Sequence, residues 1–193
     1  MPRINATISI SLDGVIQAPG RSDEDTRDGF ERGGWAVPYG DDVMMQKMGE
    51  GMTGTSAMLF GRRTYEDFAG YWPNQTDNPF TDHLNQVQKY VVSSTLTEPL
   101  PWQNSTVLPG DPAETVKELK AGSGPDLGVV GSARLLRSLL AADLVDGLTL
   151  LIHPLVLGHG RRLFPDDGVA LNLELVDSVT TSKGVVIASY HRS

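Results

Sequence analysis

A glycine, two arginines and a threonine directly follow an apolar run in residues 58–68, which read MLFGRRTYEDF. The four residues are Gly61, Arg62, Arg63 and Thr64. They stand where a predicted strand ends and a predicted helix begins, and the first N–H groups of a helix attract anions. Arginine presents paired donors that match phosphate oxygens, and the threonine can cap the helix or offer its hydroxyl to an oxygen ligand. These residues predict a phosphate site as readily as a surface arginine pair bridged to Glu66 or Asp67.

Two other predicted strands end in small or polar residues. These residues are Gly131, Ser132 and Ala133 after the segment DLGVV, and Ser93 and Ser94 after the segment YVV. Small residues let a ligand approach the backbone, although such junctions are also common turns, and a serine at a strand end can simply cap it. Open α/β sheets bind ligands outside the carboxyl ends of their strands. Together the three strand ends predict one crevice for an anion such as a pyrophosphate.

Carboxylates near strand and helix ends are candidates for acid–base chemistry. Asp13 follows the first predicted strand in the segment SLDG, where a carboxyl group could position or protonate a substrate. An aspartate before a glycine is more often a turn residue. Asp41 and Asp42 precede a predicted helix, where most aspartates act as caps.

Several site classes are absent from the sequence. There are no cysteines, and the four histidines lack metal-ligand spacing, so we expect no catalytic metal. Neither G-x-S-x-G, nor a P-loop, nor G-x-G-x-x-G occurs, which argues against an α/β-hydrolase, a P-loop kinase and the dinucleotide fingerprint. A net charge of −8 makes nucleic acid an unfavourable partner. Arg161 and Arg162, in LGHGRRLFPDD, could form a lid or an anion contact, or a turn with solvated arginines.

Length and composition predict a globular protein with one domain spanning residues 1–193. Apolar residues make up 39% of the chain and charged residues 21%, which is ordinary for such a protein. The absence of cysteines agrees with a reducing compartment, and the N-terminus has the alternation of a strand rather than the pattern of a signal peptide. The most apolar stretch, residues 148–158, is short and contains His153 and Pro154, so we expect no membrane span. A cytoplasmic location follows as an expectation.

Alternating strands and helices must position the candidate residues. Strands are predicted in residues 4–10, 56–61, 89–95, 104–110, 126–131, 144–158, 171–179 and 185–191. Helices are predicted in residues 40–52, 62–72, 81–87, 111–121 and 132–143, and residues 17–40 form a long ordered or semi-ordered loop. This order predicts an α/β fold with a mostly parallel sheet and an antiparallel C-terminal edge.

The motifs ISLDGVIQ, MLFGRRTYE, YVVSS, VVGSARL and PLVLGHGRRLFPD follow one another as in a known family. The chain resembles the dihydrofolate-reductase-like superfamily, and most closely the reductase domain of riboflavin biosynthesis and its stand-alone bacterial relatives, from about Arg3 to the last strand. The resemblance implies a three-layer fold with a central sheet of about eight strands flanked by helices. It also implies hydride transfer from NADPH, bound across the strand ends, and often a homodimer.

Site residues are carried over by position. Gly61, Arg62, Arg63 and Thr64 match the cofactor-phosphate motif, and Ser93 and Ser94 match the strand end near the adenosine 2′-phosphate. Gly131, Ser132, Ala133, Arg134 and Leu135 match the turn against pyrophosphate and nicotinamide, and Ile16 matches a position lining the nicotinamide. Asp13 matches an aspartate at the substrate end, and Asp42 lies where folate enzymes place their acid.

Three departures from the family pattern bear on function. Gly131-Ser132-Ala133 replaces a more glycine-rich turn, Val130 replaces a glutamate of the riboflavin reductases, and residues 20–40 form an insertion. The sequence thus predicts an NADPH-dependent reductase of a small heterocyclic, ribosylamino-pyrimidine or pterin-like substrate. The alternative is a non-catalytic nucleotide-binding module, and a hydrolase using Asp13 is remote. For residues 148–157, both an interface and the sheet centre fit the apolar pattern.

Overall fold

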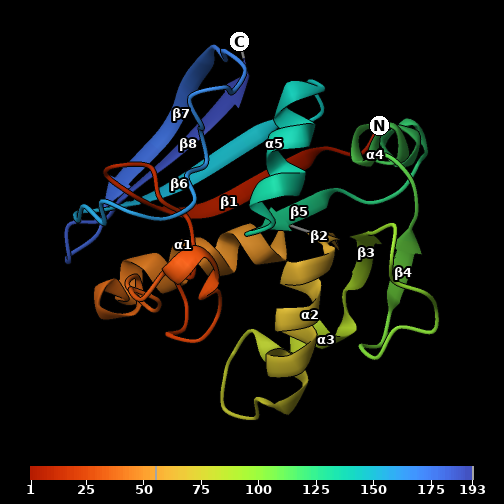
Figure 1. Ribbon diagram of the computed structural model, residues 1–193, viewed down its shortest axis with the longest axis horizontal. Helices are drawn as coiled ribbons and strands as arrows, with labels where there is room; N and C mark the ends of the chain where they lie inside the picture. The colour runs from red at the N-terminus through yellow and green to blue at the C-terminus, as the bar shows by residue number, and fades with distance from the viewer. Residues whose placement is uncertain (55, 193) are drawn as a thin grey trace. The chain divides into compact units, whose positions relative to one another are not determined.

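The computed structural model describes residues 1–54 and 56–192, and these residues form one eight-stranded sheet. The strands are β1 (Ile4–Ser11), β2 (Ala57–Gly61), β3 (Gln88–Val92), β4 (Ser105–Leu108), β5 (Leu127–Val130), β6 (Gly147–His153), β7 (Leu173–Thr180) and β8 (Val186–Arg192). Their order is β4-β3-β2-β5-β1-β6-β8-β7 (Figure 1). Strand β2 pairs in parallel with β3 and β5, whereas β8 pairs antiparallel with β6 and β7. The predicted α/β class, with a mostly parallel sheet and an antiparallel C-terminal edge, is confirmed.

The helices occur where the sequence predicts them. They are α1 (Asp42–Thr53), α2 (Arg62–Tyr71), α3 (Thr81–Gln86), α4 (Pro112–Ala121) and α5 (Ala133–Ala141), with short 3₁₀ turns η1 (Arg27–Gly29), η2 (Val37–Tyr39) and η3 (Trp72–Asn74). Helix α4 begins as its sequence predicts, because the Asp111 carboxylate accepts the N–H groups of Ala113 and Glu114. No helix in the described ranges combines the length and the apolar character that a membrane crossing requires.

Two compact units share the chain. The first contains Met1–Ala6 and Gly49–Val145, and the second contains Thr7–Met48 and the residues from Asp146 onward. Each unit is described separately below. The assignment of residues 1–193 to a single domain stays a prediction.

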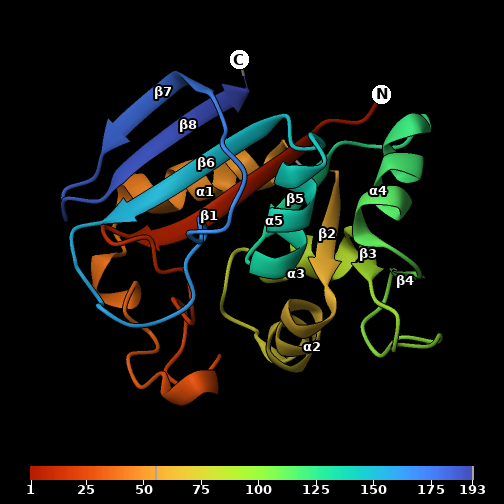
Figure 2. The ribbon, with the colours of Figure 1, turned by 45° about the horizontal axis from the view of Figure 1, so that its top comes forward.

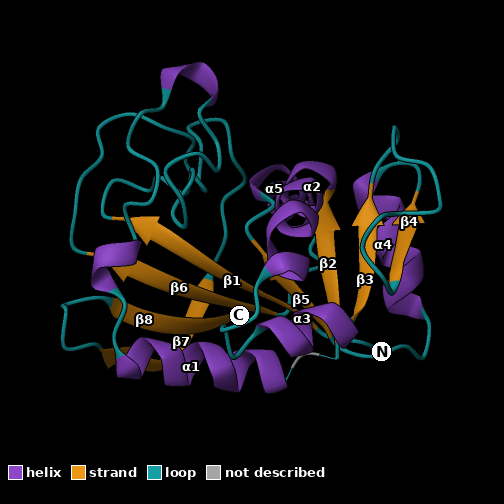
Figure 3. Ribbon diagram, turned by 90° about the horizontal axis from the view of Figure 1, so that it is seen from below, coloured by secondary structure: helices purple, strands orange, loops and turns teal. Residues whose placement is uncertain are grey.

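In the first unit, parallel strands β2, β3 and β4 lie side by side and point the same way (Figure 3). The first four residues of β2 are buried, as expected for a parallel strand covered on both faces. Helix α5 buries Leu135, Leu136, Leu139 and Leu140 and packs on α4 and β2. That spacing matches one face of a helix, so the same periodicity that predicts α5 also orients it.

A buried lysine in β3 departs from the apolar pattern of the strand. Lys89 is fully buried, and its Nζ donates to the carbonyl oxygens of Val87 at 2.7 Å, Gln103 at 3.1 Å and Asn85 at 3.3 Å. The same Nζ lies 4.4 Å from the centre of the Trp102 ring. Burial lowers the pKa of Lys89 to about 8. The three carbonyls match the three donors of an ammonium group, so Lys89 ties β3 to the C-terminal end of α3 and to the loop before β4.

In the second unit, β6, β8 and β7 form a ribbon of neighbouring strands (Figure 2). Strand β6 lies between β1 and β8, and its Leu148, Leu150 and Leu151 are buried. The sheet-centre alternative for residues 148–157 is confirmed for the strand itself, which occupies an inner position of the sheet, and a role at an interface stays a prediction. Strand β7 is the edge strand and is largely exposed.

The long loop of residues 17–40 has a core of its own. Phe30 and Trp35 pack with Val15, Ala18 and Leu157 in one buried cluster. Buried Gln17 connects separate segments of the loop. Its side-chain Nε2 donates to the backbone carbonyls of residues 25 and 27, and its backbone carbonyl accepts the indole N–H of Trp35 at 2.7 Å. The polar sequence of the loop does not reveal this buried cluster, because the residues that form it are far apart in the chain.

Candidate functional site

The first strand–helix junction joins β2 to α2 without an intervening loop. Gly61 ends the strand in an extended conformation and Arg62 begins the helix, so α2 starts at the tip of β2 (Figure 2). No side chain caps this helix. The capping alternative for Thr64 is therefore wrong. The N–H groups of the first turn lack intrahelical acceptors and point beyond the carboxyl end of β2.

The second junction, from β5 to α5, uses two left-handed residues in succession. Gly131 has φ +60° and Ser132 has φ +50°, and no side chain caps α5. A Cβ on Gly131 would lie 3.3 Å from Thr64 Cγ2, so the glycine allows a close approach of the two junctions as well as its positive φ. The sequence analysis predicted that small residues in this turn permit close contacts with the backbone, and the contact between Thr64 and Gly131 is consistent with that prediction.

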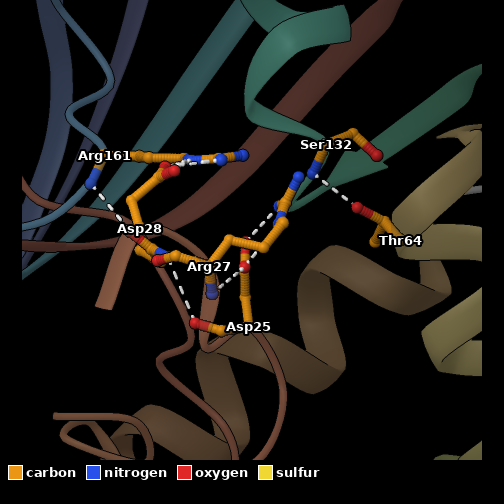
Figure 4. Close-up of polar contacts among 7 residues, drawn as sticks. Asp25, Arg27, Asp28, Thr64, Ser132 and Arg161 are labelled. Atoms are coloured by element: carbon orange, nitrogen blue, oxygen red, sulfur yellow. Dashed lines mark hydrogen bonds and ion pairs between the residues drawn. The ribbon is translucent and has the colours of Figure 1, made fainter. Parts of the chain in front are cut away.

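Two hydrogen bonds connect the junctions. The N–H of Gly61 donates to Ser132 Oγ at 3.0 Å. The N–H of Ser132 donates to Thr64 Oγ1 at 3.0 Å, as Figure 4 shows. Residues 61 and 132 are 71 positions apart in sequence, and no sequence pattern predicts that they pair. The N-termini of α2 and α5 are thereby held side by side in the first unit.

The arginines of the first junction differ in their contacts. Arg62 Nη1 lies 3.1 Å and 3.0 Å from the two carboxylate oxygens of Glu66, one turn along α2. Both side chains are substantially exposed, 39% for Arg62 and 45% for Glu66. Such a pair contributes only about 0–1 kcal/mol, so a phosphate could replace the carboxylate at little cost. Arg63 is exposed. The bridge that the sequence analysis considered is present, and it leaves the anion site possible.

The serines after β3 lie next to the same helix start. Gly61 pairs with Val92, so Ser93 follows at the level of Arg62. Ser93 is buried, and its Oγ accepts the N–H groups of Thr95 at 3.1 Å and Leu96 at 3.0 Å. Ser93 thus closes the turn after the strand, as its capping alternative predicts, whereas Ser94 is exposed.

The start of α5 offers a ligand mainly backbone N–H groups and few side chains. Ala133 is half-buried and Arg134 is exposed, while Leu135 belongs to the core with 5% of its surface exposed. Leu135 Cβ would lie 3.6 Å from a Cβ on Gly61, so this leucine packs directly under the first junction. For a ligand at this end of α5, the structure offers the first-turn N–H groups and the side chains of Ser132 and Arg134.

Asp13, in the second unit, is surrounded by donors. Its carboxylate accepts Ser11 Oγ at 2.7 Å and the N–H groups of Leu157 at 3.0 Å and Gly158 at 2.8 Å. Burial favours the neutral acid, but these hydrogen bonds outweigh it and lower the pKa of Asp13 to about 2. An aspartate with this pKa is ionised at neutral pH. It suits holding the backbone of residues 157–158 better than donating a proton.

The other candidates of the second unit are mainly structural. Ile16 is 9% exposed, and its N–H donates to the Arg161 carbonyl at 2.9 Å. Asp41 caps α1 through the Met44 N–H at 2.9 Å. The hydroxyl of Ser182 and the backbone N–H groups that reach the Asp41 carboxylate lower its pKa. Asp42 is exposed in the first turn of α1, where a carboxylate is favourable beside the helix N-terminus.

The second pair of arginines is engaged within its own unit. Arg161 donates to Asp28 Oδ2 at 2.7 Å and 3.2 Å, as Figure 4 shows, and Arg162 Nε donates to the Asp13 carbonyl at 2.8 Å. Arg27 pairs with the carboxylate of Asp25 in the same insertion. Both arginines thus lie in a loop with 35% and 47% of their side chains exposed while they bind groups of the protein, and the lid and anion-contact interpretations stay predictions.

Comparison with known proteins shows the family of the chain. Residues 2–187 match the family described as the RibD C-terminal domain. The chain belongs to this family. A protein named uncharacterized protein YyaP, from Bacillus subtilis (strain 168), is 35% identical over 140 residues, which cover 69% of this chain and 72% of the relative. The family predicted from the five motifs is confirmed.

Solved structures with low sequence identity share the fold. A pyrimidine reductase-like protein from Corynebacterium diphtheriae superimposes with a TM-score of 0.67 at 16% identity, covering 100% of this chain and 92% of the other. Dihydrofolate reductase from Enterococcus faecalis, complexed with NADP(H), gives a TM-score of 0.59 at 16% identity, covering 99% and 96%. The dihydrofolate-reductase-like fold predicted from the sequence is confirmed.

Proposed function

We propose that the protein is an NADPH-dependent reductase that transfers a hydride to a small heterocyclic substrate. The observation that carries the proposal is the pair of linked helix N-termini, α2 and α5, beside Arg62 in a chain of the RibD C-terminal domain family. Two N-termini with unpaired N–H groups suit a diphosphate, and an arginine beside them suits a further phosphate. NADPH contains both a diphosphate and a further phosphate, and the helix N-termini and the arginine that suit them both belong to the first unit.

The residues present fit such a nucleotide. Gly131 has a positive φ and no side chain, so a ligand can approach its backbone. In the proposal, the first-turn N–H groups of α2 and α5, with Gly61, Thr64, Ser132, Ala133 and Arg134, hold the diphosphate, and Arg62, Arg63, Ser93 and Ser94 hold the 2′-phosphate. Leu135 supports the turn from below, and Ile16 is proposed to line the nicotinamide. When bound, NADPH supplies the hydride.

At the substrate end we propose Asp13 and, more weakly, Asp42. Because Asp13 is ionised, its proposed role is to hold residues 157–158 and orient the substrate rather than to deliver a proton. Asp42 is exposed and free of the capping role that Asp41 performs. Hydride transfer mainly requires that donor and acceptor carbons are held in line, so few catalytic side chains are needed.

The proposed substrate class is a ribosylamino-pyrimidine or a pterin-like compound. One structural neighbour is named a putative riboflavin biosynthesis protein, and another is named a pyrimidine reductase-like protein. The first compound to test is therefore 5-amino-6-(5-phosphoribosylamino)uracil, followed by dihydrofolate and dihydropterins.

The first experiment measures stabilisation by the cofactor. Ligand that binds only the folded state raises the melting temperature, and 100 Kd of ligand adds about 2.7 kcal/mol. We expect NADPH to raise the melting temperature and Arg62→Ala to remove most of that shift, whereas Arg192→Ala, at the last residue of β8, serves as the control. No shift at millimolar NADPH would overturn the proposal.

Turnover distinguishes the second candidate function, a non-catalytic nucleotide-binding module. Val130 favours this candidate, because it places a half-buried apolar side chain, packed on the aromatic core of the first unit, where the riboflavin reductases carry a glutamate. We expect NADPH oxidation with one of the pyrimidine or pterin substrates. Tight NADPH binding without oxidation of any of them, and without an effect of Asp13→Asn, would favour the module.

A homodimer is also proposed, on the strength of the family resemblance. Sedimentation velocity over a range of protein concentrations measures the assembly state. A single species of 20.9 kDa at all concentrations would contradict the dimer.

A further inference from the structure

One arginine of the insertion uses only part of its guanidinium group. Arg27 Nε donates to Asp25 Oδ1 at 2.6 Å and Nη2 donates to Asp25 Oδ2, so one edge of the group binds the carboxylate as a fork (Figure 4). The third nitrogen, Nη1, is enclosed and makes no hydrogen bond to any residue that the structure describes. An enclosed donor without an acceptor is unfavourable, and more so when it is charged. Nη1 is therefore a candidate for donating to a ligand.

The Arg27 side chain is held in one direction. The fork with Asp25 fixes the guanidinium plane, and the Arg27 carbonyl accepts Gln17 Nε2 at 3.0 Å. Nη1 therefore cannot turn toward another acceptor unless the fork breaks. The side chain as a whole is 36% exposed, and the turn η1, which begins at Arg27, contains no buried residue. This segment lies at the surface, where a ligand can reach it.

A hydrogen-bonded network within the second unit connects Arg27 to the proposed nicotinamide site. Gln17, which binds the Arg27 carbonyl, directly follows Ile16. The backbone of Arg161 accepts the Ile16 N–H at 2.9 Å and donates to Gln17 Oε1 at 3.0 Å. The guanidinium group of Arg161 binds Asp28, the residue after Arg27. Arg27 is thus tied to the segment that the proposed function places against the nicotinamide, where a substrate receives the hydride.

The charges around Arg27 select the kind of acceptor. Burial favours the neutral acid form of Asp25, but the hydrogen bonds and the charge of Arg27 outweigh it and lower the pKa of Asp25, so this pair is ionised at neutral pH. Asp28 balances Arg161 in the same way. Two guanidinium groups and two carboxylates leave no excess positive charge for a phosphate. The two N–H groups of Nη1 instead suit an uncharged carbonyl oxygen.

We propose that Arg27 donates from Nη1 to a ring carbonyl of the substrate, and that this hydrogen bond selects heterocycles with ring carbonyls over rings that have amino groups in their place. The inference rests on the proposed function, and it adds a residue of the insertion to the recognition of the substrate. Asp25 is the positioning residue, because its carboxylate fixes the fork. An amino group would present hydrogens to Nη1 instead of lone pairs, and a site built for one hydrogen-bonding pattern rejects the other.

The test compares two pyrimidines that differ at the ring carbonyls. Diaminouracil contains the carbonyls, and tetraaminopyrimidine has amino groups in their place. Calorimetry in the presence of NADP⁺, at a pH where both compounds are uncharged, measures their affinities without turnover. We expect the wild type to bind diaminouracil about tenfold more tightly than tetraaminopyrimidine. Arg27→Met should remove most of this preference and leave NADPH binding unchanged.

Control variants separate recognition from folding. Arg27→Met leaves the Asp25 carboxylate without its partner, so a double variant, Asp25→Asn with Arg27→Met, removes both charges together and should also lose the preference. A purely structural role of Arg27 would lower the melting temperature and weaken both pyrimidines alike. Arg32→Met removes an exposed arginine from the same insertion and should keep the preference.

The outcomes have different meanings. If the wild type binds no NADPH, the proposed function fails and the role of Arg27 fails with it. If the wild type binds NADPH but binds neither pyrimidine or both equally, or if Arg27→Met keeps the preference, only the role of Arg27 is overturned. If Arg27→Met weakens NADPH binding about tenfold and keeps the preference, the acceptor is the carboxamide of the nicotinamide, and the assignment to the substrate is overturned.

Discussion

The tripeptide Gly-Arg-Arg occurs at residues 61–63 and again at residues 160–162, and the two copies have different surroundings. In the first copy, Gly61 ends a buried strand and Arg62 pairs with the exposed carboxylate of Glu66 on its own helix. In the second copy, Arg161 binds Asp28 and Arg162 binds the Asp13 carbonyl. Paired arginines alone therefore do not indicate an anion site.

The structural reason is the element that each tripeptide occupies. Residues 61–63 join a strand to a helix, so the backbone donors of the helix start lie beside the guanidinium groups. Residues 160–162 lie in a loop, where Asp28 of the insertion binds Arg161 and the Asp13 carbonyl binds Arg162. The first copy adds the backbone donors of a helix start to its guanidinium groups, whereas the arginines of the second copy bind a carboxylate and a carbonyl from elsewhere in the chain.

The largest expected difference concerns the two glycines. Gly160 has φ +129°, and a Cβ there would lie 2.6 Å from buried Val15 Cγ1 and 2.9 Å from the Phe30 ring, whereas a Cβ on Gly61 would find its nearest atom at 3.6 Å. We expect Gly160→Ala to lower the free energy of unfolding by about 3 kcal/mol and Gly61→Ala by less than about 1 kcal/mol. Urea unfolding measures both. Equal losses would contradict the comparison.

A smaller effect should follow from pH around the second copy. The pKa of Asp13 is lowered from 3.8 to about 2 in the folded state, so its ionisation stabilises the fold above the unfolded pKa. That contribution, about 2 kcal/mol, should disappear as the pH falls from about 5 to about 2. Urea unfolding of the wild type and of Asp13→Asn at several pH values measures it. We expect the difference between the two proteins to shrink on acidification, and a constant difference would contradict the assignment.

Removing one arginine from each copy should separate binding from stability. Arg161→Ala breaks the pair with Asp28 and should cost about 1 kcal/mol of stability or less, with unchanged NADPH affinity. Arg62→Ala should leave the melting temperature of the free protein nearly unchanged while weakening NADPH binding. Thermal unfolding with and without NADPH measures both quantities. A loss of NADPH affinity in Arg161→Ala alone would reverse the roles of the two copies.

The smallest effect should come from the partner of Arg62. Glu66 competes with a phosphate for the Arg62 guanidinium, at 3.0 Å and 3.1 Å, so Glu66→Gln should strengthen NADPH binding about twofold to threefold. Asp67→Asn, one position along the same helix, is the matched control for the change in charge. Titration by fluorescence quenching at low salt measures the effect. Weaker binding by Glu66→Gln would show that the carboxylate orients Arg62 rather than competing for it.

The secondary structure was predictable because each element is encoded by nearby residues. The alternation from Ile4 to Ile10, the leucine spacing of α5 and the Asp111-Pro112 helix start are local signals, and the structure confirms them. The family was predictable because its motifs occur in order. The candidate anion site was predictable in outline, since parallel strands end at one edge of a sheet.

The connections between these elements were not predictable, because they join residues that are distant in sequence. The Ser132–Gly61 hydrogen bond spans 71 positions, and the pairing of Asp28 with Arg161 spans 133. Lys89 shows the same limit in the core: its position in a strand predicts an exposed or apolar residue, and only the carbonyls of Val87, Asn85 and Gln103 make its burial favourable.

The sequence by itself therefore determined the order of the elements, the α/β class and the family, because propensity, periodicity and turn chemistry act over a few residues. The tertiary structure alone decided which groups the arginines of the two identical tripeptides bind. That choice depends on the partners brought to each arginine by the fold, Glu66 on the helix of one and Asp28 from a distant insertion for the other.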